Sequence, residues 1–354
     1  MLSREEVQRY KRQLLLPEIG ESGQLRLKNA KVLLVGAGGL GNIVAAYLAA
    51  AGVGELTIVD HDVVDGSNLQ RQVMYAKSDV GKSKSEVLTQ RLTQLNEFGK
   101  YNFLNQKFNS SNCIEITGNH YFIVDCVDQI EVRYLMNDVS ILKNIPLVYG
   151  AIHRFEGQVS VFNFQGSGSY RCAFPKPITP KSSTNCEEAG VIGVLPGIIG
   201  MYQAMEALKL IAGIGEVLTN QILMVNLLKN AHVKMGFVRK PEQIEMARER
   251  WNSSKEEDTV DLEWNQLEAF VRENTNTVFI DLQEDLEQEQ IHGVSVKHIP
   301  DYVFMDEIQQ IDKNQTVVVF CKRGVKSRWA LEVMKSLGFK NRYQLSGGMA
   351  SVTE

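Results

Sequence analysis

The chain has 354 residues, of which 44% are hydrophobic and 23% charged, and its formal net charge is -4. This length predicts about two domains, and the lack of a basic excess argues against a nucleic-acid partner. Glycines and charges interrupt the apolar runs before the roughly 18 residues that a membrane span needs, and no apolar region typical of a signal peptide follows Met1.

The cysteines stand far apart and form no Cys-x-x-Cys pair; they are Cys113, Cys126, Cys172, Cys186 and Cys321. Scattered thiols are typical of a reducing compartment. We therefore expect a cytoplasmic protein that contacts no membrane and has no structural disulfide, so that any special cysteine would be catalytic.

A capping box, Ser3-Arg-Glu-Glu6, opens a charged helix that we expect to end near Pro17. The basic residues of this helix are Arg4, Arg9, Lys11 and Arg12. From their spacing alone, these charges predict a solvated helix face.

A glycine-rich turn follows the first expected strand. Val32–Val35 predicts a buried parallel strand, and the Ala-rich stretch Ile43–Ala51 predicts a helix. Between them, four of the six residues in Gly36–Gly41 are glycine, which lets the backbone approach a phosphate at the N-terminus of that helix. Alone, such a turn favours a nicotinamide-dependent dehydrogenase, although one fold hosts many functions.

Charged residues follow the turn, and the two cations among them favour a nucleoside triphosphate instead. Asp60 ends the strand Leu56–Asp60, where a carboxylate accepts hydrogen bonds from ribose hydroxyls. Arg71 and Lys84 come next along the chain. Cations at the phosphate end of a nucleotide stabilise the charge that develops during attack at an α-phosphorus.

Asp128 follows the apolar strand Phe122–Asp125, at the sheet edge where ligands bind in such folds. A carboxylate that faces phosphates repels them unless a cation intervenes, so Asp128 suggests a Mg²⁺ site. The alternative is that Asp128 caps the helix expected from about Glu131. The sequence leaves both interpretations open.

Strands that alternate with helices predict a doubly wound, Rossmann-like, mainly parallel α/β sheet over residues 1–238. The alternating stretch Gly157–Phe164 predicts an antiparallel extension of this sheet, and residues 165–190 predict a long functional loop. A highly charged stretch, 239–258, predicts a partly helical linker, and residues 259–354 predict a second, smaller α/β domain.

Over about residues 5–235 the chain carries motifs in a fixed order, namely Arg9–Gln13, Gly36–Gly41, Ala51–Gly54, Asp60–Asp62, Ser67–Gln72, Gly81–Lys84, Asp125–Asp128, Gly157–Gln158 and Cys186–Gly190. Their order and spacing resemble the MoeB/ThiF (HesA) sulfur-carrier adenylyltransferases, a family related to the activating enzymes of ubiquitin-like proteins. The resemblance implies that ATP activates the C-terminal Gly-Gly carboxylate of a small ubiquitin-fold carrier, giving an acyl-adenylate and pyrophosphate. A carboxylate is already a nucleophile, so this reaction needs positioning and charge stabilisation but no general base.

The resemblance also implies an ATP site and a homodimer. Asp128 would hold Mg²⁺, and Arg12 would reach the phosphates of the neighbouring protomer's ATP, which replaces the solvated-face interpretation of that arginine. Arg71 and Lys84 would act on the phosphates of the chain's own ATP. The residues implied to bind the nucleotide are Gly36, Gly38, Gly39, Gly41, Asp60, Asp62, Ser67, Asn68, Leu69, Gln70, Arg71, Lys84, Asp128 and Gln129.

The chain departs from the family pattern at two places. Many members hold zinc with two Cys-x-x-Cys pairs, but here Cys172 has Pro175 at the partner position, and residues 239–246 lack cysteine. A tetrahedral site cannot close with so few ligands, so we expect no zinc. The usual asparagine after the metal aspartate is Gln129.

Cys186 lies in the expected long loop. In some relatives the matching cysteine forms a covalent link to the carrier or to a sulfur donor, and in others it is dispensable. An unreactive loop thiol is therefore the equal alternative.

In the second domain, Cys321 follows the apolar strand Val317–Phe320 and precedes an expected helix. Loop N–H groups and a helix N-terminus favour a thiolate at such a position. Further positive charge comes from Lys322, Arg323, Lys326 and Arg328.

This loop resembles that of rhodanese domains, as do Asp281–Glu284, His292–Pro300 and Leu345–Gly348. The resemblance covers about residues 260–352 and implies that Cys321 carries a persulfide. Gln283 stands where an arginine is common.

Together the two domains predict one pathway. A sulfur donor such as a cysteine desulfurase or thiosulfate would load Cys321, and the persulfide would displace AMP to give a thiocarboxylate for molybdopterin or thiamin synthesis. Two alternatives stay open. The chain could activate a ubiquitin-like modifier through a thioester on Cys186, or it could be a nucleotide-binding scaffold without catalysis.

Overall fold

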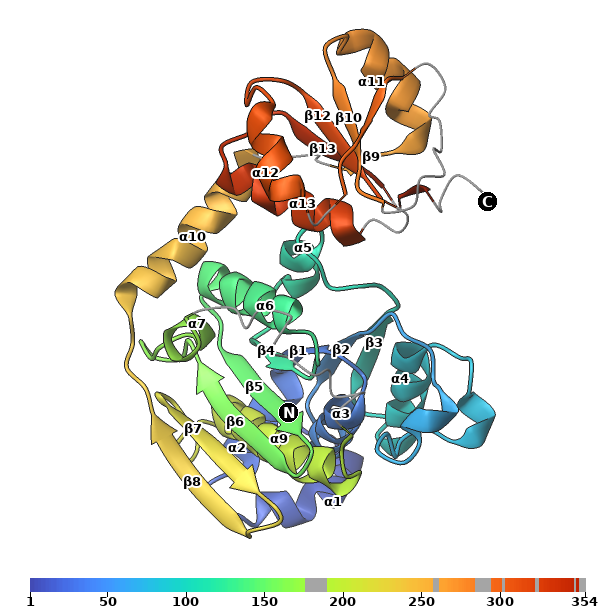
Figure 1. Ribbon diagram of the computed structural model, residues 1–354. Coiled ribbons are helices and arrows are strands. Elements are labelled where there is room, and N and C mark those ends of the chain that lie inside the picture. Colours follow the sequence, from blue (N-terminus) through green and yellow to red (C-terminus); the bar gives the residue numbers. More distant parts are fainter. Residues whose placement is uncertain are drawn as a thin grey trace. The chain divides into compact units, whose positions relative to one another are not determined.

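The computed structural model describes residues 1–175, 190–256, 261–283, 294–300, 303–321, 325–346 and 348–349. The chain divides into two compact units, residues 1–251 and 252–354, each with its own sheet (Figure 1).

The first unit is built on an eight-stranded sheet with the order β3-β2-β1-β4-β5-β6-β7-β8. Pairs from β3 to β5 are parallel, and pairs from β5 to β8 are antiparallel. The strands are β1 (Lys31–Val35), β2 (Glu55–Val59), β3 (Lys100–Leu104), β4 (Phe122–Asp125), β5 (Leu147–His153), β6 (Glu156–Phe162), β7 (Gln221–Asn226) and β8 (Ala231–Gly236). The predicted parallel sheet with an antiparallel extension is confirmed.

Helices cover both faces of the parallel part of this sheet (Figure 1). The described helices of the unit are α1 (Arg4–Leu14), α2 (Gly20–Asn29), α3 (Gly39–Ala51), α4 (Lys84–Leu95), α5 (Cys113–Thr117), α6 (Ile130–Lys143), α7 (Tyr170–Ala173), α9 (Val194–Ala212) and α10 (Pro241–Glu256). Short 3-10 turns occupy η1 (Gly66–Asn68) and η2 (Lys77–Asp79).

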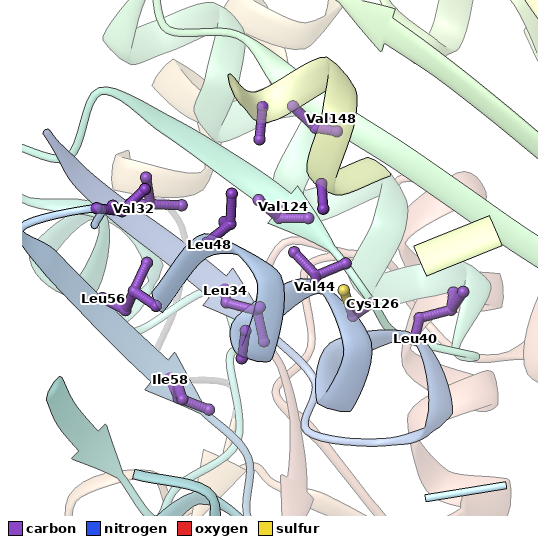
Figure 2. Close-up of a cluster of buried hydrophobic side chains, with 14 of the residues drawn as sticks. Val32, Leu34, Leu40, Val44, Leu48, Leu56, Ile58, Val124, Cys126 and Val148 are labelled. Carbon is purple, nitrogen blue, oxygen red and sulfur yellow. The ribbon is translucent and has the colours of Figure 1, made fainter. Parts of the chain in front are cut away.

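Alternation along β1 divides the core into two layers. Val32 and Leu34 point into a cluster with Leu48 of α3 (Figure 2), whereas Leu33 and Val35 pack in a second cluster with α5 and α6. A strand that is buried on both faces has a continuous run of apolar residues, and this run is why β1 could be predicted from the sequence.

Helix α9 alone, among the described helices, is long and apolar enough to cross a membrane. Half of its most apolar window is buried within the unit, and it packs against α3, β5 and β6. This packing is that of a core helix.

The N-terminal capping box is confirmed. The Glu6 N–H donates to Ser3 Oγ (3.2 Å), and the Ser3 N–H donates to Glu6 Oε2 (2.7 Å). Glu6 also binds Lys28 Nζ at 2.7 Å, which ties α1 to α2. The helix ends at Leu14, before Pro17.

Much of the stretch expected as a linker is helical. In α10, Ile244 and Ala247 are buried against Ile141 of α6 and Cys172 of α7. The first half of α10 therefore packs on the first unit.

The second unit is a five-stranded parallel sheet with the order β11-β10-β12-β13-β9. Its central strand β12 is buried on both faces, with Val317 and Val319 in one cluster and Val318 and Phe320 in another. The elements are β9 (Asp261–Leu262), η4 (Trp264–Gln266), α11 (Leu267–Glu273), β10 (Val278–Asp281), β11 (Val296–His298), α12 (Phe304–Glu307), η5 (Ile308–Gln310), β12 (Val317–Phe320), α13 (Val325–Ser336) and β13 (Arg342–Leu345). The predicted second α/β domain is confirmed.

Candidate functional site

The glycine-rich turn joins β1 to α3 and admits no larger side chains at two of its positions. Gly36 has φ +99°, and a Cβ there would lie 2.5 Å from the Cys126 carbonyl oxygen. A Cβ on Gly41 would lie 2.0 Å from the Gly36 carbonyl oxygen. Helix α3 begins at Gly39 without a side-chain cap at Gly38, so its first N–H groups have no capping side chain and suit a phosphate.

The segment Ser67–Gln72 lies against this turn. A Cβ on Gly39 would come within 3.3 Å of the Arg71 carbonyl oxygen. Asn68 is only 8% exposed, and Arg71 Nη1 donates to the Ser67 carbonyl at 3.3 Å. Two of the predicted phosphate- and nucleotide-binding side chains therefore come from a segment that folds onto the turn.

Asp60 follows β2 and is fixed by two backbone groups. Its Oδ2 accepts a hydrogen bond from the Ala37 N–H (2.6 Å), and its Oδ1 accepts one from the Asp62 N–H (2.7 Å). Burial raises the pKa of Asp60, and these two N–H donors oppose that rise. Each carboxylate oxygen keeps a second lone pair, which a ribose hydroxyl could use.

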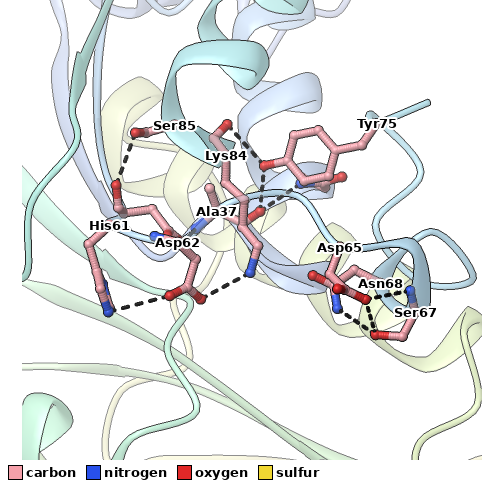
Figure 3. Close-up of polar contacts among 11 residues, drawn as sticks. Ala37, His61, Asp62, Asp65, Ser67, Asn68, Tyr75, Lys84 and Ser85 are labelled. Atoms are coloured by element: carbon pink, nitrogen blue, oxygen red, sulfur yellow. Dashed lines mark hydrogen bonds and ion pairs between the residues drawn. The ribbon is translucent and has the colours of Figure 1, made fainter. Parts of the chain in front are cut away.

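Lys84 begins α4, and its ammonium is directed toward Asp62. Lys84 Nζ lies 3.0 Å from Asp62 Oδ2, and the lysine side chain is 9% exposed (Figure 3). The Tyr75 hydroxyl lies 2.7 Å from the Ala37 carbonyl oxygen and 3.1 Å from the Lys84 carbonyl oxygen (Figure 3). Tyr75 therefore connects the start of α4 to the glycine turn.

Sequence reasoning missed Tyr75 and its neighbour Asn42. Asn42 Nδ2 donates to the Ala37 carbonyl (2.9 Å), and Asn42 Oδ1 accepts from the Met74 N–H (2.9 Å). A signal was present, because Asn42 is a polar residue inside the Ala-rich helix α3 and is fully buried.

Asp128 lies in the turn between β4 and α6 and is exposed. In the described part of the chain its carboxylate makes no hydrogen bond or ion pair, and the N-cap of α6 is Gln129 without a side-chain bond. The capping interpretation of Asp128 is therefore wrong. An unpaired carboxylate at the carboxyl edge of the sheet fits Mg²⁺, which binds through one or two carboxylates together with phosphates and water.

Arg133 of α6, which sequence reasoning also missed, makes hydrogen bonds to this turn. Its Nε donates to Asp125 Oδ2 (2.6 Å), its Nη2 donates to the Val127 carbonyl (2.7 Å), and its guanidinium lies 5.0 Å from the centre of the Tyr149 ring. Burial disfavours the charge on this side chain, but the Asp125 carboxylate outweighs burial and raises the pKa of Arg133.

Arg12 is exposed on α1. Helix α1 is anchored at the opposite end of α3, where Tyr10 packs against Gly52 and Gln13 Nε2 donates to the Ala51 carbonyl (3.0 Å). Helix α3 has 13 residues, so its two ends lie about 20 Å apart.

In the second unit, Cys321 follows β12 and is 3% exposed. Its Sγ lies 3.7 Å from Ser327 Oγ in the first turn of α13. Asp281 Oδ1 accepts from the Gln283 N–H (3.0 Å), and Asp281 Oδ2 lies 3.8 Å from His298 Nδ1.

Several predicted residues cannot be placed. Cys186, Glu284, His292, Gly347 and residues 322–324 lie outside the described part of the chain, as does the side chain of Arg328.

Comparison with protein families matches two models to the chain. The ThiF family model matches residues 10–245, and a rhodanese-like domain model matches residues 264–354. The chain belongs to the ThiF family. A probable adenylyltransferase/sulfurtransferase MoeZ of Mycobacterium tuberculosis is 35% identical to it over 99% of this chain and 93% of the relative.

Two further relatives of this ThiF-family protein match about two thirds of its length. A sulfur carrier protein adenylyltransferase of Thermus thermophilus is 44% identical over 68% of this chain and 90% of its own length. The adenylyltransferase and sulfurtransferase MOCS3 of Mus musculus is 45% identical over 63% of this chain and 48% of its own length. The prediction of an adenylyltransferase fused to a rhodanese-like domain is confirmed, and the dehydrogenase interpretation of the glycine turn is not supported.

Solved structures agree in fold. Escherichia coli MccB with ATP superimposes on the ThiF-family protein with a TM-score of 0.59, at 23% identity over 66% of this chain and 72% of that one. PaaA gives a TM-score of 0.58 at 24% identity. At this identity the likeness concerns the fold alone.

Proposed function

We propose that the first unit uses ATP and Mg²⁺ to adenylate the C-terminal Gly-Gly carboxylate of a small ubiquitin-fold sulfur-carrier protein. The second unit then supplies sulfur from a persulfide on Cys321, which gives the thiocarboxylate. The observation that carries this proposal is the presence in one chain of a ThiF-family nucleotide site and a buried cysteine in a rhodanese-like domain. We assign adenylation to residues 1–238 and sulfur transfer to residues 259–354, with residues 239–258 as the linker between them.

In this proposal the adenylation site lies at the carboxyl edge of β1, β2 and β4. The phosphates lie on the glycine turn, and Arg71 and Lys84 stabilise the charge that grows during attack at the α-phosphorus. Asp60 accepts hydrogen bonds from the ribose, beside Asn68. Asp128 holds Mg²⁺, which supplies further charge neutralisation when bound.

The same site needs a homodimer. Arg12 is held near the far end of α3, about 20 Å from the glycine turn. An arginine side chain cannot span that distance, so a contact with ATP phosphates requires the turn of a partner protomer. A C2 dimer would place each Arg12 in the site of the other chain.

We propose no zinc site in this protein. Cys172, the remaining cysteine of the usual zinc region, accepts a hydrogen bond from the Lys240 N–H (3.2 Å) and packs against Ile244 and Ala247. The contact between α7 and α10 at Cys172 is therefore apolar. The four described cysteines are free thiols, which supports a cytoplasmic location.

Sulfur transfer completes the reaction. A cysteine desulfurase or thiosulfate loads Cys321, and the terminal persulfide sulfur attacks the acyl-adenylate and expels AMP, which leaves an acyl disulfide on Cys321. A second thiol, that of Cys186 or of an external thiol reductant, then forms a disulfide with Cys321 Sγ; the bond from Sγ to the acyl sulfur breaks, and the thiocarboxylate leaves. The product serves a molybdopterin- or thiamin-type pathway.

The separation of the two half-reactions tests this proposal. Cys321→Ala is expected to keep carrier-dependent ATP–pyrophosphate exchange and to lose thiocarboxylate formation. An unchanged thiocarboxylate yield would contradict the role of Cys321. A reducible carrier adduct on Cys186 in the absence of any sulfur donor would instead favour modifier activation, and the absence of exchange would favour a scaffold.

A further inference from the structure

Two buried polar side chains form a continuous row with the reactive cysteine of the second unit. Cys321 follows β12, Ser327 lies in the first turn of α13, and Gln344 lies in β13, which pairs with β12. Their exposed fractions are 3%, 0% and 4%. Cys321 Sγ lies 3.7 Å from Ser327 Oγ, and Ser327 Oγ lies 2.9 Å from Gln344 Oε1.

The hydrogen bonds in this row have a direction. The thiol of Cys321 donates to Ser327 Oγ, and the Ser327 hydroxyl donates to Gln344 Oε1, which suits a neutral sulfur. A thiolate can only accept, so it needs the Ser327 hydroxyl to turn toward it.

We propose that Ser327 and Gln344 form a reversible hydrogen-bond relay, in which the Ser327 hydroxyl donates to Gln344 Oε1 beside a neutral sulfur and turns to Sγ to stabilise the thiolate of Cys321. Ser327 contacts the reacting sulfur and is a catalytic residue of sulfur transfer. Gln344 acts through Ser327 and is a positioning residue. The inference deepens the proposed function and rests on Cys321 as the persulfide carrier.

The relay matches the changes of charge at Sγ during loading. The Cys321 thiolate attacks the outer sulfur of thiosulfate and forms an S–S bond. The bond from that sulfur to the sulfonate group breaks, and its electron pair leaves with sulfite. The negative charge moves to the terminal sulfur, so no proton is transferred and no further oxidant is needed. The Ser327 hydroxyl donates to Sγ before the attack and returns to Gln344 afterwards.

Charged side chains on the neighbouring elements must be considered in any pH measurement. On the described parts of β10, β11, β13 and α13, the titratable side chains are Asp281, Lys297, His298, Lys326, Lys335, Arg342 and Tyr343. Substitutions at Ser327 and Gln344 leave all of them in place. Differences between variants therefore report the relay.

The test is the pH dependence of Cys321 alkylation by iodoacetamide in the full chain, followed by peptide mass spectrometry. Ser327→Ala removes the donor and is expected to raise the midpoint pH of the rate profile by about one pH unit or more, a tenfold loss of thiolate at fixed pH. Gln344→Met removes the competing acceptor of the Ser327 hydroxyl, so its midpoint is expected at or below that of the unmodified chain. A merely structural role would move both variants in the same direction.

A matched pair of variants keeps the test valid if the alanine variant misfolds. Ser327→Thr and Ser327→Val introduce side chains of nearly equal shape, and only threonine keeps the hydroxyl. The valine variant is expected to have the higher midpoint, by about one pH unit. Equal midpoints in this pair, or a parallel rise for Ser327→Ala and Gln344→Met, would overturn the relay.

The alkylation readout needs no ATP, carrier or sulfur donor. A relay that behaves as expected in a chain that forms no persulfide would overturn the proposed function alone. A chain that forms thiocarboxylate but shows equal midpoints would overturn the relay alone.

Discussion

Lys84 is a buried cation at the start of α4, and its Nζ lies 3.0 Å from Asp62 Oδ2. Lys84→Ala is expected to lower kcat for ATP–pyrophosphate exchange by about a hundredfold, because a preorganised charge that stabilises the transition state is lost. Steady-state exchange kinetics with a Gly-Gly-ending carrier measure this loss.

Lys82 is a matched control two residues away. Its Nζ lies 3.4 Å from Asp79 Oδ1, and its side chain is mostly exposed. Lys82→Ala is expected to retain nearly full exchange. Equal losses in the two lysine variants would show that the Lys84 effect is not local to the phosphates.

Arg133 and Asp125 form a buried ion pair under the turn that carries Asp128. Arg133→Ala is expected to lower the free energy of unfolding of the first unit by about 3–5 kcal/mol, since it leaves the Asp125 carboxylate buried without a partner. Urea-dependent hydrogen exchange of peptides from β4 and α6 measures the loss in the full chain.

Replacing both partners provides the control for Arg133. A chain with Arg133→Met and Asp125→Leu has no unpaired charge, so it is expected to lose less stability than Arg133→Ala. A larger loss in the double variant would mean that the charge pair is not the main contribution of Arg133.

The turn between β1 and α3 depends on glycine at Gly41. Gly41→Ala would place a Cβ 2.0 Å from the Gly36 carbonyl oxygen. The start of α3 would have to shift, so we expect at least about a tenfold loss of ATP affinity and a stability loss of about 1–3 kcal/mol. Titration with a fluorescent ATP analogue measures the affinity.

Gly66 offers a matched glycine-to-alanine change in η1. A Cβ at Gly66 would meet nothing within 4 Å. Gly66→Ala is expected to bind the analogue almost as the unmodified chain does. If Gly41→Ala bound equally well, the close approach at the turn would not control nucleotide binding.

At the level of elements, the sequence was informative wherever the signal is local. A buried strand, a glycine turn and a capping box leave short patterns, so β1, the turn and α1 could be predicted. Tyr75 and Asn42 could not, because they meet Ala37 only when distant segments fold together. Arg133 was missed because a buried arginine has the same sequence pattern as one on a solvated helix face.

At the scale of the molecule, the dimer proposal predicts complementation between two inactive chains. In a mixed dimer of Arg12→Ala and Lys84→Ala chains, one site has an intact Lys84 and receives an intact Arg12 from its partner. Each variant alone is expected to be nearly inactive. A refolded equimolar mixture is expected to recover about a quarter of the exchange activity, since half of the dimers are mixed and half of their sites are complete.

The mixture distinguishes action across the interface from action within one chain. If Arg12 served its own chain, each chain would lack one essential residue and the mixture would stay inactive. That result would contradict the homodimeric site.

The mass of a Gly-Gly-ending carrier protein reports both half-reactions together. After incubation with the full chain, ATP, Mg²⁺ and a sulfur donor, the carrier is expected to gain about 16 Da, because sulfur replaces one carboxylate oxygen after acyl activation. With Cys321→Ala, pyrophosphate is expected to form without this gain. An unchanged carrier mass with the unmodified chain, or an equal gain with Cys321→Ala, would contradict adenylation followed by sulfur transfer from Cys321.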